Sequence, residues 1–142
     1  MNARDMIKRH EGLRLNKYRD SEGNWTIGYG HLILDGERMP DAITIAEAEN
    51  LFEGDYQDAY QLCERFIPDW SVLSDIRKAV LTDMAFNLGH RLLGFKRMFF
   101  YLEMHDYLSV SMEMLDSKWA EQVGERAQEL SKLMFYNLEG VV

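Results

Sequence analysis

The spacing of hydrophobic residues changes once along this chain, and that change limits the folds it can adopt. Between residues 13 and 34, apolar and β-branched residues form short runs separated by turn residues, which is typical of strands. From Thr44 onward, apolar residues recur every three or four positions, which is typical of helices that bury one face. A short amphipathic helix is predicted before the strands, over residues 2–11. The sequence therefore predicts an α+β fold with a small sheet and a larger helical region.

The strand region is predicted to form a hairpin. Residues 13–19 and 24–28 supply its two strands, and the turn between them runs from Asp20 to Gly23. Asp at the first position and Gly at the fourth are typical of a type I turn. Residues 32–34 are expected to add a short third strand.

Capping residues set the limits of the predicted helices. Thr44 and Glu47 match a capping box, and Pro68 ends the long helix that follows. Ser74 is expected to cap a second helix, which Gly89 ends. Further amphipathic helices are predicted at 95–103, 107–115 and 125–135. We expect one domain over 1–142, with an α+β lobe at 13–43, a linking helix at 44–67, and a helical lobe of 68–142 that includes the N-terminal helix.

Composition excludes several classes of protein. The 142 residues are 46% hydrophobic, so a folded globular domain is expected. No apolar run approaches the roughly 20 residues that span a bilayer, which argues against membrane insertion. The N-terminus has no apolar signal core, so we expect cytoplasmic synthesis without a signal peptide. A single cysteine, Cys63, excludes an internal disulfide and is expected to be a packed thiol.

Charge argues against nucleic acid as a partner. The net charge is −8, whereas phosphate binding requires a basic surface. Residues 1–38 are nearly balanced, with seven Lys/Arg and six Asp/Glu, so the acidic excess lies in the rest of the chain. The four histidines are scattered and form no metal-binding pattern, so no metal or cofactor is expected.

Glu11 lies in a position that is unfavourable for a charged side chain. It ends the predicted N-terminal helix on the inward stripe that includes Met6 and Ile7, one residue before Gly12. Partial burial and the negative end of the helix dipole both disfavour an ionised carboxylate there. These effects favour a protonated acid near neutral pH, as in a general acid. A partner for a buried base is the alternative interpretation.

Asp20 supplies a second carboxylate, and Thr26 follows on the returning strand. A glycoside hydrolase needs one protonated acid and one ionised group acting on the opposite face of the sugar. Each residue also has a structural interpretation, because Asp20 suits its turn and Thr26 suits a strand. The catalytic interpretation therefore depends on the combination with Glu11.

This segment resembles the catalytic segment of the T-even-type phage lysozymes, glycoside hydrolase family 24. The resemblance is carried by Glu11-Gly12-Leu13-Arg14-Leu15, by Tyr18-x-Asp20-x-x-Gly23-x-x-Thr26-Ile27-Gly28-x-Gly30-His31, and by Ala85-Phe86-Asn87-Leu88-Gly89. It continues through Ser117-Lys118-Trp119-x-x-Gln122-x-x-x-Arg126-Ala127, so it covers nearly the whole chain. It implies a lysozyme-like fold and a bacteriolytic muramidase that cleaves the β-1,4 bond between N-acetylmuramic acid and N-acetylglucosamine in peptidoglycan.

The resemblance also implies roles for individual residues. Glu11 would be the general acid, while Asp20 and Thr26 would position the attacking water in an inverting reaction. Leu32 and Phe86 match substrate-binding positions, with core packing as the alternative for each. Arg126 matches an arginine that would pair with Glu11, although Glu125 beside it is a departure from the family. A monomer acting on glycan strands is expected.

A further pair is predicted to be structural. Asp55 falls inside an apolar helical stripe and His31 follows the glycine-rich strand, so we expect a hydrogen bond between them that links the lobes.

Two other functions compete with hydrolysis. An inactive peptidoglycan-binding module on the same fold would not need Glu11, Asp20 and Thr26 together. A transglycosylase would use the acid but not a second carboxylate that handles water. Without a signal peptide, the enzyme would reach the wall through holin-type release or tail delivery.

Overall fold

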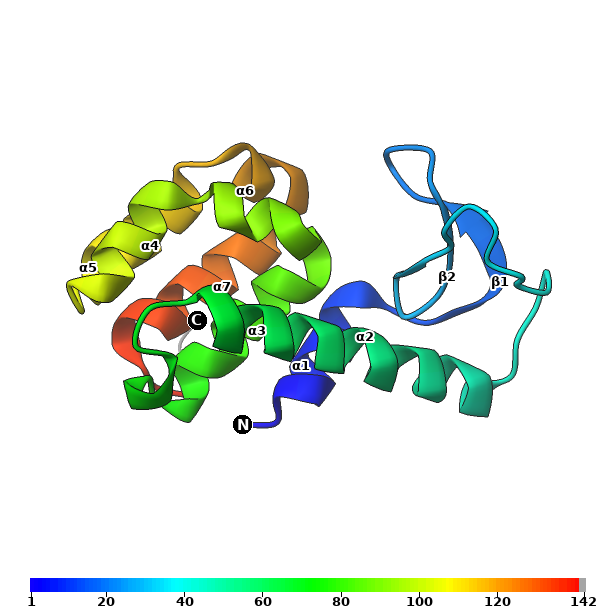
Figure 1. The fold of residues 1–142 in the computed structure, drawn as a ribbon, viewed down its shortest axis with the longest axis horizontal. Coiled ribbons are helices and arrows are strands. Elements are labelled where there is room, and N and C mark those ends of the chain that lie inside the picture. Colours follow the sequence, from blue (N-terminus) through cyan, green and yellow to red (C-terminus); the bar gives the residue numbers. More distant parts are fainter. Residues whose placement is uncertain (141–142) are drawn as a thin grey trace. The chain divides into compact units, whose positions relative to one another are not determined.

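The computed structural model describes residues 1–140, and its secondary structure confirms the predicted α+β class (Figure 1). Contacts divide the chain into two compact units, here called unit 2 (residues 4–58) and unit 1 (residues 1–3 and 59–142). Unit 2 holds the sheet with most of the first helix and the first part of the long helix. Unit 1 holds the remaining helices. This grouping differs from the expected lobes, because residues 4–11 belong with the sheet.

Unit 2 contains all but the first residue of the helix α1 (Ala3–Glu11), which buries Met6 and Ile7. Gly12 ends this helix with a φ of 73°, and its N–H donates to the Lys8 carbonyl at 2.9 Å. Glycine adopts this left-handed conformation without steric cost, which makes it a common helix end. The helix therefore ends where the sequence predicted, with Glu11 as its last residue.

A three-stranded antiparallel sheet follows, with strand order β1-β2-β3. The strands are β1 (Arg14–Arg19), β2 (Trp25–Gly28) and β3 (His31–Leu32). The Gly23 N–H donates to the Asp20 carbonyl at 3.0 Å, which confirms the predicted turn. The third strand was expected at 32–34, but its pairing opposite β2 joins Thr26 to Leu32 and Ile27 to His31. Pairing with a neighbour, and not local propensity, fixes this strand.

The long helix α2 (Ile45–Phe66) contributes residues to both units. Its capping box is confirmed, because the Glu47 N–H donates to Thr44 Oγ1 and the Thr44 N–H donates to Glu47 Oε1, each at 3.1 Å. The helix ends two residues before Pro68. In unit 2, its residue Ala48 packs with Ile27 and Ile43 to form a small apolar core.

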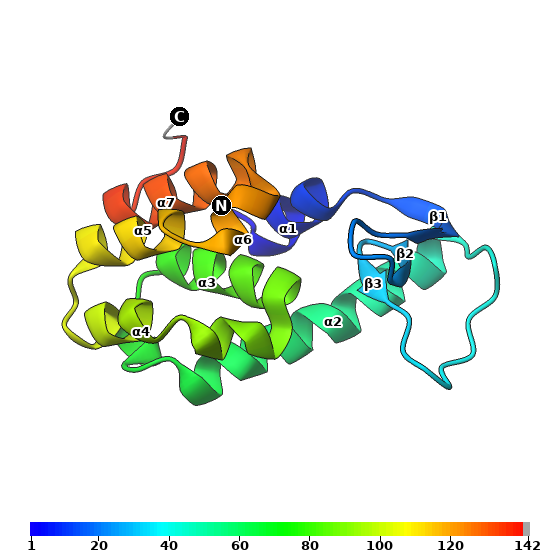
Figure 2. The same ribbon diagram turned by 90° about the horizontal axis from the view of Figure 1, so that it is seen from above.

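Unit 1 is built from short helices. They are α3 (Asp75–Leu88), α4 (Lys96–Glu103), α5 (Tyr107–Leu115), α6 (Lys118–Val123) and α7 (Glu125–Tyr136), with the 3₁₀ turns η1 (Trp70–Val72) and η2 (Gly89–Gly94). Figures 1 and 2 show α5 beside α4 and α7, and these pairs are in contact. Ser74 caps α3 as predicted, accepting a hydrogen bond from the Arg77 N–H at 3.1 Å. Helix α6 was not predicted.

The cysteine prediction is confirmed in unit 1. Cys63 is free, fully buried and 3.4 Å from the Leu81 carbonyl, to which its thiol donates. Burial raises the pKa of this thiol to about 12, so it stays protonated. Within residues 1–140, no helix is long and apolar enough to cross a bilayer.

Candidate active site

The three candidate catalytic residues all lie in unit 2, on α1 and on the hairpin that follows it. Helix α1 carries Glu11 at its C-terminal end, where Oε2 is buried from solvent. The other carboxyl oxygen, Oε1, lies against the backbone of Gly30 so closely that a β-carbon added to Gly30 would overlap it. The Glu11 carboxyl therefore occupies a confined position beside the turn after β2.

Tyr18 connects this carboxyl electrostatically to the hairpin. The pKa of Tyr18 is raised, first by burial and then by the negative charge of Glu11, with a smaller contribution from Asp20. Both carboxylates are thus close enough to disfavour a phenolate at Tyr18. The hydroxyl keeps its proton at neutral pH.

Asp20 and Thr26 are joined through the backbone of Asn24. The Asp20 Oδ1 atom accepts hydrogen bonds from the backbone N–H groups of Glu22 and Asn24, at 2.9 and 2.8 Å. The Thr26 hydroxyl, on a residue that is only 4% exposed, donates to the Asn24 carbonyl at 3.0 Å. The turn interpretation of Asp20 is therefore correct, and it is compatible with catalysis because the bonds engage one carboxylate oxygen.

Leu32 and Phe86 differ in their surroundings. Leu32 pairs with Thr26 across the sheet and is 45% exposed, so core packing does not explain its side chain. Phe86 lies on α3 in unit 1 and is half-buried. For both residues, contact with a sugar stays a prediction.

Arg126 has a partner that the sequence did not reveal. Its Nε atom donates to Asp83 Oδ1 at 2.8 Å inside unit 1, and the Asp83 side chain is fully buried. Asp83 lies 43 positions away in a helix whose other buried residues are apolar except for Thr82, so no local pattern signals the pair. Glu125, the departure from the family beside Arg126, is exposed. The proposed pairing of Arg126 with Glu11 stays a prediction.

The predicted hydrogen bond between His31 and Asp55 is confirmed, with 2.7 Å between Nδ1 and Oδ2. It does not link two lobes, because both residues belong to unit 2. Sequence analysis also missed Glu37, whose Oε2 lies 2.8 Å from His31 Nε2. The hydrogen bond to Asp55 makes the largest contribution and the one to Glu37 a smaller one, and together they raise the pKa of His31 to about 9, although burial lowers it. His31 is therefore an imidazolium held between two carboxylates, which is a structural role.

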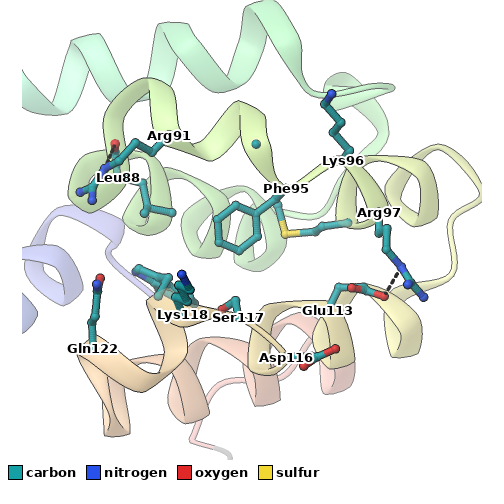
Figure 3. Close-up of a pocket in the computed structure, with 13 residues that line it drawn as sticks. Leu88, Arg91, Phe95, Lys96, Arg97, Glu113, Asp116, Ser117, Lys118 and Gln122 are labelled. Atoms are coloured by element: carbon teal, nitrogen blue, oxygen red, sulfur yellow. Dashed lines mark hydrogen bonds and ion pairs between the residues drawn. The ribbon is translucent and has the colours of Figure 1, made fainter.

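Unit 1 contains a pocket of about 460 Å³ that sequence analysis did not identify. Its lining residues come from α3, η2, α4, α5 and α6, so only the packing of these helices creates it. Figure 3 shows Phe95 on one side and Lys118 and Gln122 on another, with the ion pair of Arg97 Nε and Glu113 Oε1 at 2.9 Å nearby. Among residues 1–140, no group of three or more His, Cys, Asp or Glu side chains is placed to hold a metal ion.

Comparisons with known proteins identify the family of this chain. The family model described as "Phage lysozyme" matches residues 8–133, which include Glu11, Asp20 and Thr26. The chain therefore belongs to the phage lysozyme family. It is a lysozyme, an enzyme that hydrolyses peptidoglycan.

Several relatives support this assignment. "Probable T4-type lysozyme 1" of Dictyostelium discoideum is 30% identical, and the alignment covers 89% of each chain. "Endolysin" of Acyrthosiphon pisum secondary endosymbiont phage 1 is also 30% identical, over 82% of this chain and 75% of the relative. The pre-baseplate central spike protein of Enterobacteria phage T4 is 30% identical over 98% of this chain, which matches only 28% of that longer protein.

Proposed function

We propose that this lysozyme cleaves the β-1,4 bond between N-acetylmuramic acid and N-acetylglucosamine, with inversion at the anomeric carbon. Glu11 donates a proton to the leaving glycosidic oxygen. Asp20 and Thr26 position a water molecule, and the Asp20 carboxylate accepts its proton as it attacks the opposite face of the sugar. Inversion requires the two carboxyl groups to be roughly 6.5–9.5 Å apart, which leaves room for that water.

The confined position of the Glu11 carboxyl carries this proposal. A carboxyl with one oxygen buried and the other against a glycine backbone has limited access to water, which favours its protonated form. Asp20, in contrast, lies on a hairpin where two backbone N–H groups donate to one of its carboxylate oxygens and orient the carboxyl. The two carboxyl groups thus have environments suited to an acid and a base.

Secondary roles follow from the same assignment. Leu32 is proposed to contact the sugar beside Thr26, and Phe86 to contact the glycan strand from unit 1. Arg126, which pairs with Asp83, is proposed as a supporting residue. The enzyme is proposed to act as a monomer on the cell wall. Its relatives include an endolysin and a pre-baseplate central spike protein, and delivery to the wall by holin-type release or by a phage tail is proposed.

The test compares wild-type protein with Glu11→Gln on purified peptidoglycan. Removal of a general acid is expected to lower the rate about 10²–10⁴-fold while the fold is retained. Glu64→Gln, the same change at an exposed carboxylate on α2, is the matched control and is expected to leave the rate unchanged. Equal lysis by wild type and Glu11→Gln would exclude this mechanism, whereas no lysis by either protein would favour the binding-module alternative.

Product mass separates hydrolysis from transglycosylation. Hydrolysis adds one water to each cleaved bond, whereas transglycosylation by intramolecular attack leaves an anhydro sugar. We expect only hydrated products, because Asp20 is suited to activating water. Anhydro products from the wild-type enzyme would overturn the role proposed for Asp20 and Thr26.

A further inference from the structure

The position of the Glu11 carboxyl depends on the backbone of Gly30. A β-carbon at Gly30 would overlap Glu11 Oε1 and lie 3.1 Å from the carboxyl carbon. Gly30 also has a φ of 68°, a left-handed conformation that favours glycine. Any group that fixes this turn therefore also fixes the place available to the Glu11 carboxyl.

Tyr29, the residue before Gly30, anchors the turn. It is flanked by two glycines with left-handed φ values, Gly28 at 70° and Gly30 at 68°. Its ring packs on the small core of unit 2, with its centroid 5.6 Å from that of Phe52. Its hydroxyl donates to Glu49 Oε1 at 3.0 Å. The pKa of Tyr29 is raised, first by burial and then by this hydrogen bond, so the hydroxyl remains a donor at neutral pH.

Glu49 also binds the helix that carries Glu11. Its second carboxylate oxygen, Oε2, accepts a hydrogen bond of 2.5 Å from Lys8 Nζ, three residues before Glu11 on α1. The Lys8 ammonium lies 5.4 Å from the Tyr29 ring centroid and 4.9 Å from that of Phe52, within the range of cation–π attraction. One carboxylate on α2 thus joins the two segments that meet at the Glu11–Gly30 contact.

We propose that Lys8, Glu49 and Tyr29 form a clamp that positions the Glu11 carboxyl for proton transfer. Tyr29 is a positioning residue in this arrangement, because it acts on Glu11 through the Gly30 backbone and not on the substrate. The inference rests on the proposed role of Glu11 as general acid. Proton transfer requires the acid to lie within hydrogen-bond reach of the leaving oxygen, and a displacement of about 1 Å can cost up to about 10²-fold in rate.

The test is Tyr29→Phe, which removes the hydroxyl and keeps the ring in the core. On a soluble peptidoglycan fragment we expect kcat to fall about 3- to 10-fold with KM unchanged, because the acid is displaced while the sugar contacts remain. The alkaline limb of the pH–rate profile is expected to move to lower pH. A looser turn admits water to Glu11 and favours its ionised form. Glu49→Leu, which removes both hydrogen bonds, is expected to have an effect at least as large.

Arg4→Gln is the matched control. Arg4 joins the same two helices one turn earlier, donating from Nε and Nη2 to the Glu53 carboxylate at 2.9 and 2.8 Å. It also lies 4.3 Å from the Tyr56 ring centroid, as Lys8 lies near two rings. This variant is expected to lose some stability toward urea while its kcat and pH–rate profile stay those of wild type.

The outcomes separate the clamp from the mechanism on which it rests. Circular dichroism first establishes that Tyr29→Phe and Glu49→Leu are folded. If Glu11→Gln is inactive while both clamp variants keep the wild-type kcat and pH profile, the clamp is structural only and this inference is wrong. If both clamp variants lower kcat and move the profile while Arg4→Gln does not, the clamp is supported. Full activity of Glu11→Gln would overturn the general-acid role, and the clamp with it.

Discussion

The two units of this lysozyme are stabilised in different ways. Unit 1 buries many large apolar side chains, including Leu81, Met84, Leu92, Met98, Leu102, Met114, Leu130 and Met134. Unit 2 buries fewer large apolar side chains, among them Ile7, Ile27 and Phe52, and several charged side chains join its segments. Apolar burial has no preferred direction, whereas charge-assisted hydrogen bonds fix both distance and angle.

The candidate catalytic residues belong to the unit that depends more on directional contacts. Glu11 is the last residue of the helix that Lys8 and Arg4 attach to α2, and Thr26 lies in the sheet whose third strand begins at His31. The position of the catalytic groups should therefore respond to pH and to single polar substitutions. The fold of unit 1 should respond chiefly to changes in its buried core. Three predictions test this difference.

The largest effect on stability is expected in unit 1, from Asp83→Ala. This change leaves the Arg126 guanidinium, whose side chain is only 9% exposed, without the carboxylate that accepts from Nε. Removing one partner of a buried ion pair typically costs about 3–5 kcal/mol in the free energy of unfolding. Urea denaturation at pH 7 measures this loss in the free energy of unfolding. Asp75→Ala, at an exposed position on the same helix, is the control and is expected to cost less than about 1 kcal/mol. Equal losses in both variants would contradict a buried pair.

A smaller and pH-dependent effect is expected in unit 2, from His31→Gln. The pKa of His31 is raised to about 9 in the folded protein, above the ordinary value of 6.5. A raised pKa contributes stability that is fully present below about pH 6.5 and is lost as the pH rises through about 9. The substitution should therefore cost on the order of 1–3 kcal/mol at pH 6 and clearly less at pH 10.

Urea unfolding of wild type and His31→Gln at pH 6 and pH 10 measures this difference. His90→Gln, at an exposed histidine in unit 1, is the control and is expected to change stability little at either pH. The same loss at both pH values in His31→Gln would show that packing, and not the charge of His31 between Asp55 and Glu37, stabilises this part of unit 2.

The smallest effect is expected from Glu53→Gln, at the exposed end of the contacts between α1 and α2. The hydrogen bond from Arg4 lowers the pKa of Glu53 to about 2. The ionised Glu53 therefore contributes stability that is present above about pH 4.5 and is lost as the pH falls through about 2. Solvent screens this pair, so the loss at pH 7 should be under about 1 kcal/mol and should shrink in 0.5 M salt. Urea midpoints at low and high salt measure it. A loss that is larger than for Asp83→Ala would reverse the comparison of the two units.

Local sequence signals predicted much of the fold. Gly12, the Thr44–Glu47 capping box and Ser74 act on their own helix ends, so their effects follow from a few adjacent residues. The third strand was misplaced by one residue at its start because pairing with β2 sets its limits. Helix α6 was missed because it is only six residues long, although Ser117 before it and Gly124 after it are recognisable caps.

In the candidate site, too, local features were predicted from the sequence and contacts between distant residues were not. Glu11, Asp20 and Thr26 lie within 16 residues of one another, so their spacing was visible in the sequence and the hairpin was enough to relate two of them. Asp83 and Glu37 were not predicted as partners of Arg126 and His31. Nothing in the local pattern of either acidic residue identifies a cation that another element brings beside it.

The sequence by itself determined the α+β class, most helix limits, the hairpin turn and the spacing of the candidate catalytic residues. Each of these depends on neighbouring residues, because caps, turns and hydrophobic periodicity act over one or two turns of chain. The tertiary structure alone decided which charges meet and where the Glu11 carboxyl lies. Tyr29 reaches Glu49, and Glu49 reaches Lys8, only after the sheet and α1 have packed against α2.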